Sequence, residues 1–231
     1  MKHIQINDLT LGYGTRKIIK NLSLTINKGE YIYVIGENGV GKSTLIKGLI
    51  GTLKPIKGSI KFDENFKKND IGYIPQLNTS MKNFPASVLE IVLSGTINSN
   101  VFSVFYKKSE KELTKKVLKE LNIYDLKDKC FKELSGGQQR KVLLARAMTS
   151  TSKILIMDEP VTGLDPKATN NFYELIKKLN KENNITVIVV SHDIKSAAKY
   201  ADKILHIHND GYCFGTVDEF KSNIISEYFE E

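Results

Sequence analysis

The residues best suited to chemistry in this chain of 231 residues form one glycine-rich stretch, Gly36-Glu37-Asn38-Gly39-Val40-Gly41-Lys42-Ser43-Thr44. It fits the pattern G-x-x-x-x-G-K-[ST], in which backbone N–H groups close around nucleotide phosphates. In that pattern Lys42 pairs with the β- and γ-phosphates, and Ser43 is a ligand of Mg²⁺. The alternative is a chance glycine turn, which arises in roughly one chain in a hundred of this length. The stretch therefore predicts a nucleotide-binding loop.

The segments on either side of the loop supply the context that the motif needs. Residues 31–35 (YIYVI) are a short, apolar, β-rich run typical of a buried strand, and residues 44–50 (TLIKGLI) have helical character. The N-terminus of such a helix adds partial positive charge beside the phosphates. We therefore expect a strand, the loop and a helix in succession.

Polar residues also stand where later strands are predicted to end, at the carboxyl edge where sheets of this kind bind ligands. Asp158 ends an apolar run, where an acid that holds Mg²⁺ is expected, and the adjacent Glu159 carboxylate can polarise a water toward the γ-phosphate. Gln76 is placed to bridge Mg²⁺ and the same water, and His192 to lie near the γ-phosphate. The alternative interpretation, which a chain without the loop would favour, is an exposed acidic turn at Asp158 and Glu159. Gln76 would then be a structural glutamine and His192 a packed histidine.

A second glycine motif, Leu134-Ser135-Gly136-Gly137-Gln138, opens the helical pattern of residues 138–148. Ser135 is the expected N-cap, so the motif predicts a second helix N-terminus that can bind an anion. One triphosphate does not need two such sites in one chain. A head-to-tail dimer would use both, with each chain covering the nucleotide of the other. The alternative is a capped helix without a ligand.

Two alternating segments before the loop, residues 4–9 and 18–26, predict half-buried strands with a break at Leu11-Gly12-Tyr13-Gly14. They favour an antiparallel sheet ahead of the loop. Tyr13 in that break is either an aromatic ring that stacks on a base or an ordinary turn tyrosine.

The remaining pattern predicts the fold class. Strands are expected at 59–62 and 71–74, and the character of residues 78–132 is helical. The β-rich character returns at Lys153 and alternates with helical segments to the end. Such alternation favours an α/β fold with a mostly parallel sheet, preceded by an N-terminal antiparallel β subdomain and interrupted by a helical insertion at about 77–150.

Composition excludes several classes of protein. Hydrophobic residues make up 41% of the chain, yet no run approaches the roughly 18 apolar residues of a membrane span, and the start lacks the apolar stretch of a signal peptide. Cys130 and Cys213 lie far apart without metal-ligand spacing, which favours a reducing compartment. The net charge of +8 comes from scattered lysines, which indicate a solvated surface rather than a nucleic-acid partner.

Taken in chain order, these motifs resemble those of the ATP-binding cassette family, the ATPase subunits of ABC transporters. The resemblance covers essentially the whole chain and implies one P-loop NTPase domain over 1–231, with its core at 1–76 and 151–231 and a helical subdomain at about 77–150. It implies Mg²⁺-dependent ATP hydrolysis and a dimer that sandwiches two ATP molecules.

The resemblance also assigns roles to single residues. It implies adenine stacking by Tyr13, Mg²⁺ ligation by Ser43, Gln76 and Asp158, and catalysis by Glu159, His192 and Gln76. It implies nucleotide contacts from Gly36, Asn38, Gly39, Gly41, Lys42, Ser43 and Thr44, from the signature residues Ser135, Gly136, Gly137 and Gln138, and from Asp165 of the D-loop Gly163-Leu164-Asp165.

The segment before the signature lacks the TxVGExG pattern of exporters, which favours an importer subunit at the cytoplasmic face of the membrane. Membrane permease subunits, a second copy of the chain and an extracytoplasmic solute-binding protein are then the expected partners. Residues 83–95 (NFPASVLEIVLSG) resemble the corresponding stretch of zinc and manganese importer cassettes, and share residues with iron-chelate importers. The resemblance implies that this stretch abuts the surface where the permease docks.

Two alternatives stay open. A soluble iron–sulfur assembly ATPase would need a long coiled-coil insertion, and a DNA-repair or translation-factor cassette would need a tandem cassette. The chain has neither.

His206 and His208, two residues apart, could face one side of a strand and touch metal, but two solvent-facing histidines fit the pattern as well.

Overall fold

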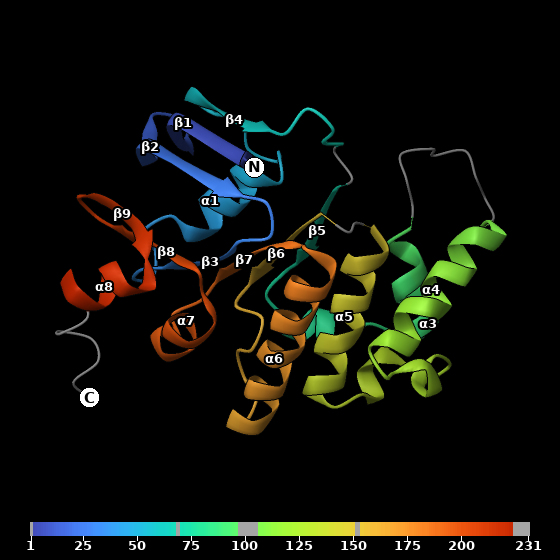
Figure 1. The fold of residues 1–231 in the computed structure, drawn as a ribbon. Helices are drawn as coiled ribbons and strands as arrows, with labels where there is room; N and C mark the ends of the chain where they lie inside the picture. Colours follow the sequence, from blue (N-terminus) through green and yellow to red (C-terminus); the bar gives the residue numbers. More distant parts are fainter. Residues whose placement is uncertain (1, 68–69, 97–105, 151–152, 224–231) are drawn as a thin grey trace. The chain divides into compact units, whose positions relative to one another are not determined.

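The computed structural model describes residues 2–67, 70–96, 106–150 and 153–223 (Figure 1). Among them, two compact units are distinguished: the first spans residues 1–66, 156–159 and 177–231, and the second spans 67–155 and 160–176. The subdomain boundaries expected from the sequence near residues 76 and 151 stay a prediction. Each unit is built around its own set of strand or helix contacts.

A three-stranded antiparallel sheet of the first unit has the order β2-β1-β4. It contains β1 (Lys2–Tyr13), β2 (Arg16–Asn27) and β4 (Lys57–Phe62). The break expected around Gly12 is wrong, because β1 runs on through Tyr13. A Cβ atom at Gly12 would lie 2.1 Å from the Arg16 carbonyl oxygen, so this glycine allows the two strands to approach instead of ending one of them.

The second sheet of the first unit is mostly parallel, as expected. Strand β3 (Tyr31–Ile35) lies between β7 (Thr186–Val190) and β8 (Lys203–His208) and is parallel to both. Strand β9 (Gly211–Thr216), which the sequence pattern did not predict, pairs antiparallel with β8. Every residue of β3 and β7 is buried, which explains why both are continuous apolar runs rather than alternating ones.

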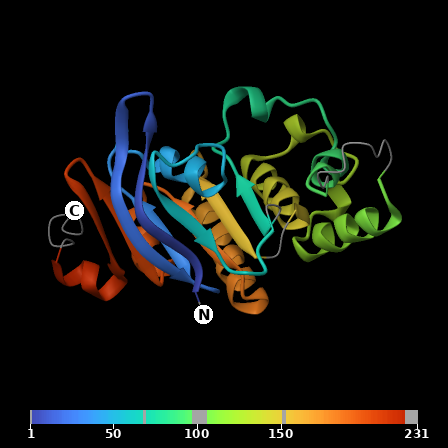
Figure 2. The same ribbon diagram turned by 90° about the horizontal axis from the view of Figure 1, so that it is seen from above.

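Helices of the first unit follow its strands. They are α1 (Lys42–Leu49), α7 (Ile194–Tyr200) and α8 (Val217–Asn223). Gly48 of α1 leaves room for Leu11, whose Cδ1 would lie 2.6 Å from a Cβ atom at that glycine. Figure 2 shows the long β1–β2 hairpin with the β8–β9 hairpin beside it, and the Tyr212 hydroxyl accepts a hydrogen bond of 2.9 Å from the Ser23 N–H.

The second unit is mainly helical. Its elements are β5 (Ile71–Ile74), α2 (Thr79–Lys82), α3 (Val88–Ser94), α4 (Lys108–Glu120), the short 3₁₀ turns Tyr124–Leu126 and Phe131–Glu133, and α5 (Gly136–Ser150). Helix α3 packs against α4 and α5. A Cβ atom at Gly95 would lie 2.1 Å from the Arg146 carbonyl oxygen, so glycine is what lets α3 and α5 come this close.

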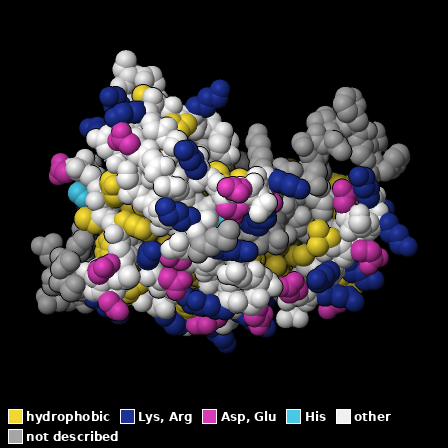
Figure 3. Space-filling view, turned by 45° about the horizontal axis from the view of Figure 1, so that its top comes forward, with side chains coloured by type: hydrophobic (Ala, Val, Ile, Leu, Met, Phe, Trp, Pro, Cys, Tyr) yellow, Lys and Arg dark blue, Asp and Glu magenta, His cyan; other side chains and the backbone are white. Residues whose placement is uncertain are grey.

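Two elements cross the division between the units: β6 (Ile154–Asp158) and α6 (Pro166–Asn183). In the first unit, the end of β6 lies beside β7. None of the helices in the described part of the chain is both long and apolar enough to span a membrane. On the face drawn in Figure 3, Lys and Arg side chains are interspersed with Asp and Glu rather than gathered into one patch.

Candidate functional site

The glycine-rich loop follows β3 and ends at the first residue of α1, as the sequence predicts. Gly36 has φ 147°, and a Cβ atom there would lie 2.2 Å from the Ile207 carbonyl oxygen. Gly41, the N-cap of α1, has φ 116°, a value that side-chain-bearing residues rarely adopt. These two glycines therefore let the loop curl tightly between the strand and the helix, while Asn38, Gly39 and Ser43 stay exposed.

Lys42 folds back over this loop and is almost fully buried. Its Nζ donates hydrogen bonds to the carbonyl oxygens of Gly36 at 2.6 Å and Glu37 at 2.8 Å. Burial lowers the pKa of the Lys42 ammonium, and the charges of Glu159 and Asp158 oppose that shift. The positive charge is thus held at a fixed point on the loop, facing two carboxylates.

Those carboxylates stand at the end of β6, and their environments differ. Burial raises the pKa of Asp158, the neighbouring charge of Glu159 raises it further, and Lys42 lowers it. Glu159 has φ 46°, a left-handed backbone conformation that is uncommon for a residue with a side chain and typical of functional sites. Two adjacent acids beside one buried lysine form a site with a surplus of negative charge, which a cation would relieve.

Main-chain hydrogen bonds bring His192 to the same place. The Glu159 N–H donates to the Val190 carbonyl oxygen at 2.9 Å, and the Ser191 N–H donates to the Val34 carbonyl oxygen at 3.2 Å. His192 comes next in the chain, and its Nδ1 lies 3.1 Å from Glu159 Oε1. The His192 side chain is 71% exposed and that of Glu159 only 13%, so the histidine stands between the carboxylate and solvent.

Tyr13 lies at the end of β1 with its ring 47% exposed. The Lys47 Nζ donates to the Tyr13 hydroxyl at 3.2 Å and lies 5.4 Å from the ring centroid. This hydrogen bond is the main cause that lowers the pKa of the Tyr13 hydroxyl. One lysine of α1 thus orients the ring, and enough of the ring is open for a flat ligand to stack on it.

The signature motif lies in the second unit, at the start of α5. The Ser135 Oγ accepts from the Gln138 N–H at 3.3 Å, and the Gln138 Oε1 accepts from the Ser135 N–H at 3.0 Å. These two bonds form the reciprocal cap expected of Ser135. A Cβ atom at Gly137 would meet nothing within 4 Å, so space is open beside this helix N-terminus.

Two other predicted residues also belong to the second unit. Gln76 is exposed and follows β5 after Pro75. Asp165 is the N-terminal cap of α6, and its Oδ1 accepts from the Ala168 N–H at 2.8 Å. The D-loop aspartate therefore has a structural role of its own, independent of any ligand.

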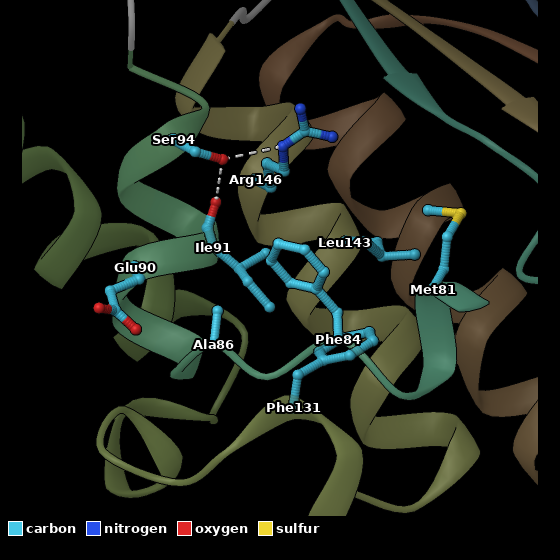
Figure 4. Close-up of a pocket in the computed structure, with 9 residues that line it drawn as sticks. All are labelled: Met81, Phe84, Ala86, Glu90, Ile91, Ser94, Phe131, Leu143 and Arg146. Carbon is cyan, nitrogen blue, oxygen red and sulfur yellow. Dashed lines mark hydrogen bonds between the residues drawn. The ribbon is translucent and has the colours of Figure 1, made fainter. Parts of the chain in front are cut away.

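The sequence reasoning missed a cavity of about 360 Å³ in the second unit. Figure 4 shows the Phe84 ring beside the Ile91 side chain, with Glu90 pointing away and Arg146 held by Ser94, whose Oγ accepts from the Arg146 Nε at 3.1 Å. The lining residues are Met81, Phe84, Ala86, Glu90, Ile91, Ser94, Phe131, Leu143 and Arg146. Five of them lie in the 83–95 stretch, which is the signal that could have located the cavity.

The two histidines of β8 are neighbours. The ring centroids of His206 and His208 lie 5.6 Å apart, so the pair does face one side of the strand. Both are half-buried, and burial lowers the pKa of His206. Over the part of the chain that the structure describes, no three His, Cys, Asp or Glu side chains are grouped as metal ligands.

Comparison with known proteins decides the family. The family model described as ABC transporter matches residues 19–162, from within β2 to the residue before the D-loop. The chain belongs to the ABC transporter family. Proteins of this family bind ATP and hydrolyse it to power transport, and this cassette is an ATPase of that kind. The expectations for the family and the fold class are thereby confirmed.

Similar proteins cover almost all of this cassette. The high-affinity zinc uptake system ATP-binding protein ZnuC of Bacillus subtilis is 34% identical over 211 residues, which are 90% of this chain and 91% of its own. The manganese transport system ATP-binding protein MntB of the same organism is 34% identical over 218 residues, 93% of this chain and 87% of its own. An inward-facing structure assigned to a metal-chelate type ABC transporter matches with a TM-score of 0.87 at 31% identity, covering 99% of this chain and 90% of its own.

Asp158→Asn should raise the melting temperature of the metal- and nucleotide-free cassette at neutral pH. Burial and the charge of Glu159 raise the pKa of the Asp158 carboxyl more than Lys42 lowers it, so its surroundings disfavour the carboxylate, and the amide removes that penalty. We expect a gain on the order of 2–4 °C by differential scanning calorimetry in EDTA. Asp193→Asn is not a suitable control because Asp193 caps α7, whereas Asp210→Asn, at an exposed position in the turn between β8 and β9, is. A lower melting temperature for Asp158→Asn would contradict the electrostatic description of this site.

Proposed function

We propose that this cassette hydrolyses ATP at the end of β6, with Glu159 as the base that activates water and His192 as the residue that holds it in place. The observation that carries the proposal is the 3.1 Å contact between His192 Nδ1 and Glu159 Oε1 at the edge of the sheet that also bears the glycine-rich loop. A carboxylate that is 13% exposed and oriented by a second polar group suits a general base. The strained backbone of Glu159 is a further sign of function.

The loop is proposed to bind the triphosphate of ATP. N–H groups of residues 36–44 surround the phosphates, and the Lys42 ammonium exchanges its two carbonyl partners for β- and γ-phosphate oxygens. Tyr13 stacks on the adenine. Phosphate oxygens are stronger acceptors for an ammonium than neutral carbonyl groups, so this exchange is favourable.

Mg²⁺ fits the donors at the end of β6. Asp158 and Ser43 offer hard oxygen atoms, and the raised pKa of Asp158 marks a carboxylate that gains from a nearby cation. We propose that these two residues hold the ion, which would neutralise charge on the phosphates when bound. The role of Gln76 as a further ligand is implied only by the family resemblance. The Asp158 side chain then serves as the ligand, and that of Glu159 stays available for the water.

The signature is proposed to act on the nucleotide of a second copy. Ser135 caps α5 by accepting from the Gln138 N–H, and the open space at Gly137 leaves room for a phosphate at this helix N-terminus. Two copies in head-to-tail arrangement would then enclose two ATP molecules, with Asp165 of each D-loop near the partner. ATP binding would close this dimer, and hydrolysis would open it.

Glu159→Gln should reduce ATP hydrolysis by roughly 10²–10⁴-fold while leaving ATP binding intact, because the amide cannot accept a proton. ATP with Mg²⁺ should then trap a dimer, measured by light scattering on gel filtration. Glu182→Gln, an exposed carboxylate of α6, is the matched control and should turn over and elute like wild type. Wild-type turnover in Glu159→Gln would remove this residue from the mechanism.

The cavity of the second unit is proposed as the docking surface for a permease subunit at the cytoplasmic face of the membrane. The lining of the cavity is mostly apolar. Phe84, one of the lining residues, is 54% exposed, and so large an exposed apolar side chain is often covered by a binding partner. Glu90 and Arg146 supply one charge of each sign beside it. We propose that the occupant is a short cytoplasmic helix of the permease that inserts a large apolar side chain.

Phe84→Asp should abolish co-purification of the permease with tagged cassette from detergent-solubilised membranes, because a carboxylate cannot be buried in an apolar contact without a partner. Ile56→Asp is the control, since Ile56 is 48% exposed and lies in the first unit. Its co-purification should match wild type. Equal losses in both variants, or none in Phe84→Asp, would place the permease elsewhere.

The transported solute is proposed to be a divalent transition metal, zinc before manganese, delivered by an extracytoplasmic solute-binding protein. The support is the 83–95 stretch together with relatives named for zinc and manganese transport. An iron chelate is the alternative, favoured by the likeness to a metal-chelate type transporter. Gly95, the last residue of the stretch, is weaker support for a metal solute than the others. The packing of α3 on α5 requires a glycine there whatever the solute.

A deletion strain should grow poorly when zinc is chelated and recover when zinc is added. The cassette gene on a plasmid should restore growth, and the same plasmid carrying Glu159→Gln should not. Growth with limiting manganese and with a ferric chelate as the iron source provides the two comparisons. A defect only on the iron chelate would overturn the metal-ion assignment and leave the ATPase untouched.

A further inference from the structure

Arg140 is a buried charge one turn beyond the signature motif, and the sequence reasoning gave it no role. It lies on α5 with only 2% of its surface exposed and is among the largest buried side chains in the described residues. Its Nη2 donates to the Thr162 carbonyl oxygen at 2.9 Å. Its Nε and Nη1 are buried and, within the described part of the chain, have no hydrogen-bond partner.

This arrangement lowers the stability of the folded protein. Buried polar atoms are nearly always hydrogen-bonded, and a buried charge without a counterion lowers stability. Burial lowers the pKa of the Arg140 guanidinium to about 10, so the group is still charged at neutral pH. An apolar side chain of similar length would fill the same volume without that penalty, which indicates that Arg140 is present for a reason other than stability.

The position of its one acceptor suggests the reason. Thr162 belongs to the turn Val161–Asp165, in which the Leu164 N–H donates to the Val161 carbonyl oxygen at 3.0 Å. The same turn touches the signature, because a Cβ atom at Gly136 would lie 3.1 Å from Leu164 Cδ2. Two contacts, one polar and one apolar, thus join this turn to the first two turns of α5 inside the second unit.

We propose that Arg140 is a positioning residue that fixes the D-loop turn Val161–Asp165 to the signature helix, so that both segments meet the nucleotide of a second copy as one body. The inference rests on the proposed dimer for its effect on turnover. The guanidinium reaches the turn through a main-chain carbonyl, so it controls the path of the backbone rather than one side chain.

Arg140→Met should keep or raise the melting temperature of the cassette. It should lower ATP turnover by the dimer about 10- to 100-fold relative to wild type. Affinity for ATP in the monomer, measured by fluorescence titration, should change less than about twofold, since Arg140 is in the other unit from the loop. Arg140→Lys keeps a charged donor and should recover part of the turnover. A purely structural arginine predicts the reverse pattern, a lower melting temperature with activity lost in proportion, and that result would overturn the proposal.

Lys141→Met is the matched control, because it removes a cation from the adjacent position of α5 whose Nζ donates to the Leu121 carbonyl oxygen instead. It should turn over like wild type. Wild-type turnover in Arg140→Met would also overturn the proposal.

Hydrogen exchange on the monomer separates this inference from the proposed dimer. In Arg140→Met the Leu164 N–H should exchange about tenfold faster, the factor expected for loss of one hydrogen bond, while the N–H groups of the middle of α5 keep their protection. Unchanged exchange at Leu164 would show that Arg140 does not hold the turn. Failure of Glu159→Gln to dimerise with ATP would instead overturn the dimer, and the exchange result would still decide the role of Arg140.

Discussion

The register of β3 against β7 is the constraint on which the candidate site depends. Val34 pairs with Val190, and the chain then delivers Ser191 to the Val34 carbonyl and Glu159 to the Val190 carbonyl. A slip of one residue would turn each following side chain to the opposite face of the sheet. Because both strands are buried on both faces, such a slip would also disturb the packing of every apolar residue in them. The two acids and the histidine are therefore brought to the same edge of the sheet by backbone pairing, before any contact between their side chains is considered.

Local patterns were enough to predict the parts of the site that depend on local chemistry. The loop between a buried strand and a helix and the cap at Ser135 follow from residue type and from where an apolar run stops, whereas the contact between His192 and Glu159 was not predicted. The extension of β1 through Gly12 was not predictable in the same way. A glycine there reads as a turn, and only the approach of the Arg16 carbonyl on the next strand shows that it is needed for pairing.

Arg140 and Gly95 show the same limit in the helical unit. An arginine on a Lys- and Arg-rich helix reads as a surface residue, and nothing near it in the sequence indicates that it is buried against a carbonyl beyond β6. Gly95 matches a family stretch, but its reason is the Arg146 carbonyl of a helix about 50 residues later in the chain. Both depend on long-range packing, which has no periodic signature in a single sequence.

Each of the two units contains charged groups that are buried. Lys42, Asp158 and Arg140 are each charged groups whose pKa is shifted by burial toward the neutral form, so the burial of each charge lowers the stability of the folded chain. All three stand at or next to motifs of the ATPase rather than in the general core. Selectivity for a metal needs a different arrangement, in which several His, Cys or carboxylate ligands converge, and the described residues contain no such group. If the proposed contact at the apolar cavity of the second unit holds, this cassette would contribute to the choice of solute through the permease that the cavity accepts.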